Sequence, residues 1–194
     1  MVLSGVMVKM GLFGIIRWLI PVFPEAASRY SDIIIILSIT GIIYASCIAM
    51  VQDNIKKLVA YSSIAHIGLM CASLFAANQS GVQGVMMQMF NHGINIIGMW
   101  IVADLLEKQT GVKEISRLSG VANKAPVLTV MFVIIALANI ALPLTNAFTG
   151  ELLMFSGLYQ FNGWYAVLAG TGIILAAVYI LNLIQKVFYG SSNA

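Results

Sequence analysis

Charged side chains are scarce in this 194-residue sequence. Lysine, arginine, aspartate and glutamate together make up 9% of it, whereas 60% of the residues are hydrophobic. A soluble domain carries about 25% charged residues, so the composition excludes a water-soluble fold and predicts a membrane-embedded one. Cysteine is scarce too. Cys47 and Cys71 both lie in apolar segments, and their spacing indicates neither a disulfide framework nor a metal site, so they are interpreted as small buried hydrophobic residues.

Strand-like alternation of polar and apolar residues is missing as well, which leaves helices as the structure that can cross a membrane. A helix needs about 20 apolar residues for a crossing. The sequence predicts crossings at residues 2–22, 33–51, 55–77, 81–106, 126–159 and 164–188. The fifth is too long for a simple span, and Pro143 near its middle predicts a broken helix. The predicted fold is an all-α, polytopic bundle of about six transmembrane helices in a single domain, residues 1–194.

Basic residues are distributed unequally between the two ends of this predicted bundle, which bears on its orientation. One end holds seven of them: Lys56, Lys57, Lys108, Lys113, Arg117, Lys124 and Lys186. The other end holds Arg17 and Arg29. The excess predicts that the first end, which includes the N-terminus and the polar connector 108–124, is cytoplasmic.

Four ionisable residues, Lys9, His66, His92 and Glu151, lie inside these apolar segments. Such a group costs at least ~2.5–3.5 kcal/mol to insert, so its presence favours a functional role. Histidine suits proton transfer because its unperturbed pKa is about 6.5. His66 and His92 each lie roughly twelve residues from the turn at 78–80, which predicts equal depth on antiparallel neighbouring helices. Metal binding is disfavoured, since neither histidine has a further ligand at helical spacing.

Structural interpretations of the same residues stay open. Lys9 could extend its ammonium to the membrane interface, and either histidine could be an ordinary core residue. Glu151 could be an interfacial carboxylate beside a proline kink. Lys56 and Lys57, at the start of a helix, could act only as topology signals.

Four ordered motifs resemble a known family. The first is the run from Asp53 through Lys56, Lys57 and His66 to Gly68. The others are residues 8–11 followed by Arg17, residues 88–93 (Gln-Met-Phe-Asn-His-Gly), and residues 142–151 (Leu-Pro-Leu-Thr-Asn-Ala-Phe-Thr-Gly-Glu). Together they resemble the antiporter-like, proton-translocating membrane subunits of respiratory complex I, in particular subunit M, the counterpart of mitochondrial subunit 4. The resemblance covers nearly the whole chain.

This resemblance implies a role for each motif. Lys9 corresponds to the central channel lysine, and Lys56 lies on the cytoplasmic side of the hydrophilic axis. Glu151, after the helix break at Pro143, corresponds to the terminal acid near the periplasmic exit. Together with His66 and His92, Lys9 and Glu151 would carry protons across a bacterial inner membrane, as part of NADH-quinone oxidoreductase.

The resemblance also implies partners and cofactors. The chain is expected to contact lipid and the neighbouring antiporter-like subunits, and to bind no nucleic acid. It is expected to bind no cofactor, because NADH, FMN, the iron–sulfur clusters and quinone would be bound in other subunits. Members of the family are much longer, so the chain is expected to be a fragment of a larger subunit. Alternative functions are a cation/proton antiporter or membrane-bound hydrogenase subunit of the same fold, or an inert membrane scaffold.

Overall fold

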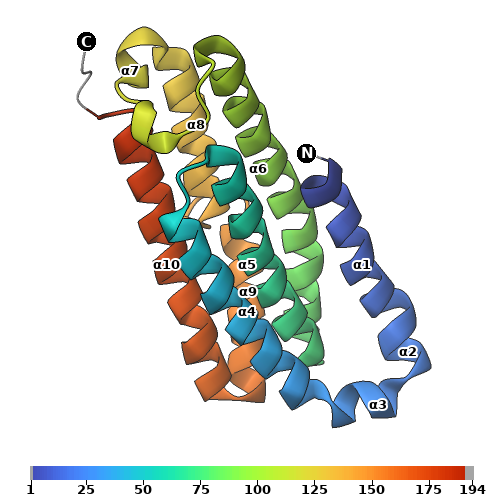
Figure 1. The fold of residues 1–194 in the computed structure, drawn as a ribbon. Coiled ribbons are helices and arrows are strands. Elements are labelled where there is room, and N and C mark those ends of the chain that lie inside the picture. Colours follow the sequence, from blue (N-terminus) through green and yellow to red (C-terminus); the bar gives the residue numbers. More distant parts are fainter. Residues whose placement is uncertain (1, 191–194) are drawn as a thin grey trace.

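The computed structural model describes residues 2–190, and the regular elements in that range are all helical (Figure 1). The long helices are α4 (Ser31–Val51), α5 (Ile55–Phe75), α6 (Gln79–Thr110) and α10 (Gly163–Val187). The shorter elements are η1 (Leu3–Met7), α1 (Val8–Gly14), η2 (Ile15–Leu19), α2 (Ile20–Val22), α3 (Pro24–Arg29), η3 (Ile115–Arg117), α7 (Val121–Lys124), α8 (Pro126–Asn139) and α9 (Phe148–Phe161). The predicted all-α fold class is confirmed.

Five helical stretches in the described range are long and apolar enough to cross a membrane. They are Leu3–Val22, Ser31–Val51, Ile55–Phe75, Gln79–Thr110 and Gly163–Val187. A further crossing is made by α8 and α9 in series, with an irregular segment at residues 140–147 between them. Each of the two has 14 residues, roughly 21 Å, and is too short to cross about 30 Å of hydrocarbon alone. The break predicted from Pro143 is therefore present.

Asparagine residues are the N-caps of three of the long helices. Asn54 accepts hydrogen bonds from the backbone N–H of Lys56 and Lys57, at 2.9 and 3.2 Å. Asn78 caps α6 and Asn162 caps α10 in the same way. At its other end α6 continues beyond the predicted limit of residue 106, because the first left-handed residue is Gly111, with φ of 70°.

The crossings alternate in direction, so the turns between them gather at two ends of the bundle (Figure 1). One end holds the α4–α5 turn, the segment 111–125 with η3 and α7, and the last turn of α10. We refer to it as the connector end. The opposite end holds α3, the α5–α6 turn and the α9–α10 turn. This division groups the basic residues as the sequence predicted, with the lysine-rich segments together.

Glycines allow α6 and α9 to pack with their backbones in close contact. A Cβ atom added to Gly84 would lie 2.7 Å from the nitrogen of Met154 and 2.8 Å from the carbonyl oxygen of Gly150. Nearer the opposite end, Gly81 and Gly157 face each other in the same way. Small residues at helix crossings are typical of membrane proteins, where van der Waals packing drives helix association. This close contact brings the side chains of α9 against those of α6.

Candidate functional site

Three of the predicted ionisable residues meet in the interior of the bundle. His66 on α5 and His92 on α6 have ring centroids 4.8 Å apart. Glu151 on α9 places Oε1 3.2 Å from Nδ1 of His66. All three side chains are buried, with exposed fractions of 7%, 1% and 5%. The two rings therefore lie at one depth on neighbouring helices, as the spacing from the turn at 78–80 predicted, and both face the interior of the bundle.

Glu151 lies in the first turn of α9, directly after the helix break. The N-terminus of a helix carries a partial positive charge, which favours a carboxylate at this position. Gln88 on α6 donates a hydrogen bond from Nε2 to Oε1 of Glu151, at 3.3 Å. The break thus creates a helix N-terminus inside the protein, and α6 holds the carboxylate that follows it.

The break itself is fixed to α6 by amide side chains. Asn91 donates to the carbonyl oxygen of Asn146, at 2.7 Å, and the side chains of Asn95 and Asn146 form two reciprocal hydrogen bonds of 3.3 Å. Thr145 donates its hydroxyl to the carbonyl oxygen of Leu142, at 2.7 Å. Irregular backbone at membrane depth needs such partners. These contacts hold the broken span to the helix that carries His92.

Lys9 lies on α1, with 6% of the residue exposed. Its ammonium donates a hydrogen bond to the carbonyl oxygen of Ser4 on η1, the helical segment that precedes α1. Gly5, one turn earlier, packs against Gly93 and Ile97 of α6, and Lys9 therefore lies on the face of α1 that turns toward α6. The side chain is therefore buried, with its ammonium directed toward the start of the helical stretch Leu3–Val22.

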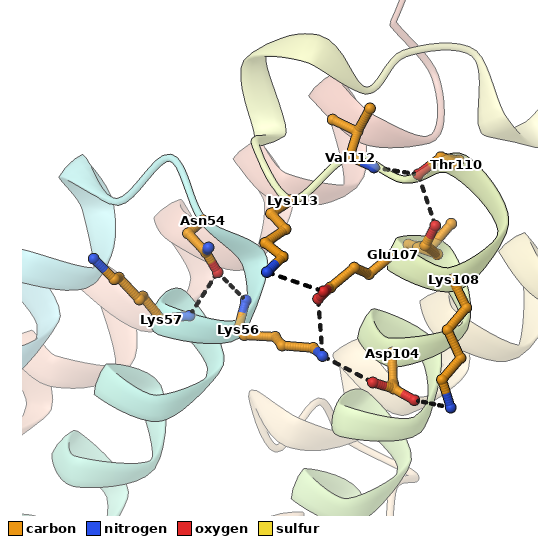
Figure 2. Close-up of polar contacts among 10 residues, drawn as sticks. Asn54, Lys56, Lys57, Asp104, Glu107, Lys108, Thr110, Val112 and Lys113 are labelled. Atoms are coloured by element: carbon orange, nitrogen blue, oxygen red, sulfur yellow. Dashed lines mark hydrogen bonds and ion pairs between the residues drawn. The ribbon is translucent and has the colours of Figure 1, made fainter.

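Lys56 is separate from this group. It lies ten residues before His66 on α5, roughly 15 Å away along the helix. Figure 2 shows its ammonium between two carboxylates of α6, 2.8 Å from both Asp104 and Glu107. Lys108 pairs with Asp104, and Lys113 of the connector pairs with Glu107. These ion pairs join α5, α6 and the connector.

A second polar contact fixes the connector to the α4–α5 turn. Ser116 donates its backbone N–H and its hydroxyl to the carboxylate of Asp53, at 2.8 and 2.7 Å. These hydrogen bonds hold the pKa of Asp53 below its ordinary value, because they stabilise the ionised form.

Other polar residues surround the histidines, and the sequence interpretation missed two of them. Tyr179 of α10 donates its hydroxyl to Ser62 Oγ, at 3.0 Å, and Asn139 of α8 donates to the same oxygen at 3.3 Å. The Ser63 hydroxyl lies 3.1 Å from Nε2 of His92. A tyrosine deep inside an apolar helix was the available signal for Tyr179. For Asn139 the signal was an amide in an apolar run.

In the part of the chain that the structure describes, Nε2 of His66 is buried and makes no hydrogen bond. A cavity of about 20 Å³ lies beside His66, Glu151 and Tyr179. This is enough room for about one water molecule. Within residues 2–190, histidine, cysteine and carboxylate side chains do not gather in threes as a metal site would require. The arrangement suits the transfer of protons between neighbouring side chains.

A helical membrane bundle with a broken span and a row of buried lysine, histidine and glutamate is the architecture of an antiporter-like membrane protein. The chain belongs to the family described as NADH:quinone oxidoreductase/Mrp antiporter, TM, which matches residues 1–176. It is 41% identical over 189 residues to NADH-quinone oxidoreductase subunit M of Rickettsia prowazekii (strain Madrid E), which covers 97% of the chain and 38% of that protein.

Solved structures agree with this assignment. A chain of respiratory complex I from Thermus thermophilus with bound NADH is 30% identical, with a TM-score of 0.92 over 96% of this chain and 40% of that one. A chain of the Mrp complex from Dietzia sp. DQ12-45-1b shares the fold, with a TM-score of 0.89 at 19% identity over 96% of this chain and 35% of that one. The chain thus spans about two fifths of the length of these relatives.

Proposed function

We propose that this chain is a proton-carrying part of the membrane arm of an NADH-quinone oxidoreductase, within a larger antiporter-like subunit. The observation that carries the proposal is the buried contact series from His92 to His66 to Glu151. The proposal names this enzyme because relatives of the chain are called NADH-quinone oxidoreductase subunit M. The chain supplies no redox chemistry in this proposal, and NADH, FMN, the iron–sulfur clusters and quinone are bound by other subunits.

The geometry supports a role for each residue. Protonated His66 can pass the proton on Nδ1 to Oε1 of Glu151, which leaves a neutral imidazole and a neutral carboxylic acid. His92 exchanges protons with His66, and the centroids of the two rings are 4.8 Å apart. Lys9 is buried on the face of α1 that turns toward α6, and in this proposal it exchanges protons with His92. Pro143 contributes by ending α8 and so placing Glu151 at an internal helix N-terminus.

The orientation follows from charge. Because the connector end carries most of the basic residues, we place it on the cytoplasmic side of a bacterial inner membrane, with the N-terminus of this chain on the same side. Glu151 then delivers protons toward the opposite, periplasmic side. Lys56, held between Asp104 and Glu107, lies at the cytoplasmic start of the hydrophilic axis. Neighbouring membrane subunits of the complex and lipid are the expected partners.

Replacing Glu151 by Gln tests the proposal in the assembled complex. Glutamine keeps the shape and can still hydrogen-bond, but it cannot take up a proton from His66. We expect proton translocation in proteoliposomes, measured with a pH-sensitive dye during NADH oxidation, to fall roughly tenfold or more. Glu25→Gln is the matched control, because Glu25 is an exposed carboxylate on α3 and should behave as wild type. Unchanged translocation in an assembled Glu151→Gln complex would refute the proposal.

A second candidate is a cation/proton antiporter, which the fold shared with the Mrp complex favours. The same vesicles separate the two functions. Sodium uptake driven by a pH gradient, without NADH, would support the antiporter. Proton uptake that needs NADH oxidation and is insensitive to sodium would support the oxidoreductase.

A further inference from the structure

Tyr179 separates two cavities that lie one after the other along α10. The inner cavity, of about 20 Å³, is the one beside His66 and Glu151. The outer cavity, of about 30 Å³, lies toward the connector end and is lined by Gln52, Asn182 and Lys186 among others. Tyr179 lines both cavities and is itself only 1% exposed. Each cavity has room for one or two water molecules, at about 10–15 Å³ each.

The sequence of α10 explains why the cavities are in line. Residues three or four apart share one face of a helix. On the face that includes Tyr179, the residues toward the opposite end are small, namely Ala169, Gly172 and Ala176, and they leave space beside α5. Toward the connector end the same face carries the polar residues Asn182 and Lys186. The face therefore runs from exposed polar groups, past one buried hydroxyl, to the histidine site.

The hydroxyl of Tyr179 is already aligned for transfer. It donates to Ser62 Oγ at 3.0 Å, and Ser62 lies one turn before His66 on α5. His66 lines the inner cavity, and its Nε2 makes no hydrogen bond with any residue that the structure describes. A proton that reaches the inner cavity therefore has an acceptor available.

We propose that protons reach His66 from the connector end through these two cavities, with the Tyr179 hydroxyl as the relay between them. A protonated water in the outer cavity gives its extra proton to the Tyr179 oxygen and is left as neutral water, while the original hydroxyl proton leaves toward Ser62 or water in the inner cavity. The tyrosine ends with one proton, as it began, and His66 Nε2 takes up the proton that was released. The proposal rests on the proposed function and adds the side and the route by which the site is loaded.

Side-specific labelling tests the outer cavity. In a complex in which Cys47 and Cys71 of this chain are replaced by alanine, Asn182→Cys is treated with the membrane-impermeant cation MTSET, separately on each side of the vesicle. Labelling from the connector end should lower proton translocation roughly tenfold or more, and treatment from the other side should have no effect. Leu181→Cys is the matched control, since its side chain is 51% exposed on the outside of the bundle, and its treatment should leave translocation unchanged. Absence of labelling at Asn182→Cys, or labelling without inhibition, would overturn the route.

Tyr179→Phe tests the relay, because it retains the ring and removes only the hydroxyl. We expect translocation to fall roughly tenfold or more, with assembly and thermal stability close to wild type. Tyr159→Phe, at an exposed tyrosine on α9, is the control. Translocation at the wild-type rate in Tyr179→Phe would overturn the relay. A parallel Glu151→Gln complex keeps the two proposals distinct: if it fails to pump while Tyr179→Phe pumps normally, only the access route is wrong.

Discussion

The buried charges of this protein are arranged as neighbours rather than as isolated residues. A salt bridge placed in the interior only for stability is a weak device, since the cost of desolvation can exceed the attraction between the charges. His66 Nδ1 lies 3.2 Å from Oε1 of Glu151, so the two residues form such a pair when His66 is protonated. Both side chains also line a cavity with room for about one water molecule. Titratable groups that contact each other and border such a cavity can exchange protons, which a purely structural pair does not need.

Replacing Lys9 tests whether the buried ionisable residues carry protons. Lys9→Ala in the assembled complex should lower NADH-driven proton translocation roughly tenfold or more, because it removes a proton-exchanging group at the His92 end of the series. Assembly should persist, since alanine is compatible with the helix and leaves no buried charge unpaired. Translocation and the yield of intact complex are both measured.

Lys57→Ala is the control for this substitution. Lys57 lies at the start of α5, is exposed and makes no ion pair within the described residues, so its replacement should change neither quantity. Full coupled activity in the Lys9→Ala complex would show that the lysine is structural.

Among the elements, the broken span shows most clearly what the sequence could and could not predict. Pro143 and the excessive length of residues 126–159 predicted the break. Its conformation was not predictable, because Ala141 and Leu144 adopt φ values of 50° and 76° although neither is glycine. Hydrogen bonds from α6 to Asn146 fix this backbone, and those contacts come from residues far away in the sequence.

Contact between α6 and α9 leads to a second prediction. Gly84→Ala should destabilise the protein by about 1–3 kcal/mol, because the new methyl group would overlap the backbone of α9. It should also move Glu151 away from Gln88 and His66, and so reduce translocation. Thermal unfolding in detergent and the translocation assay measure the two effects.

Gly41→Ala is the matched control on α4. A Cβ atom at Gly41 has nothing within 4 Å, so this variant should be as stable as wild type or slightly more stable. Equal melting temperatures for Gly84→Ala and Gly41→Ala would contradict the packing argument.

For the molecule as a whole, residue periodicity and charge predicted the crossings and the grouping of the turns at two ends. The depth of His66 and His92 followed from counting residues to one turn. The partners of Lys56 did not follow, because Asp104 and Glu107 lie about fifty residues later and only the fold brings them near. Tyr179 was missed for the same reason, since its contact with Ser62 joins residues 117 positions apart.

The connector end offers a prediction with a defined dependence on pH. Hydrogen bonds from Ser116 lower the pKa of Asp53 in the folded protein. An acid with a lowered folded pKa contributes stability above its unfolded value, about 3.9, and this contribution is lost as pH falls through the folded value. Ser116→Ala should therefore lower the melting temperature at pH 7, and the difference from wild type should shrink as the pH falls below about 4. Ser119→Ala, an exposed serine in the same connector, should match wild type at every pH. If the Ser116→Ala difference were the same at pH 7 and in acid, the Asp53 carboxylate would not be what Ser116 stabilises.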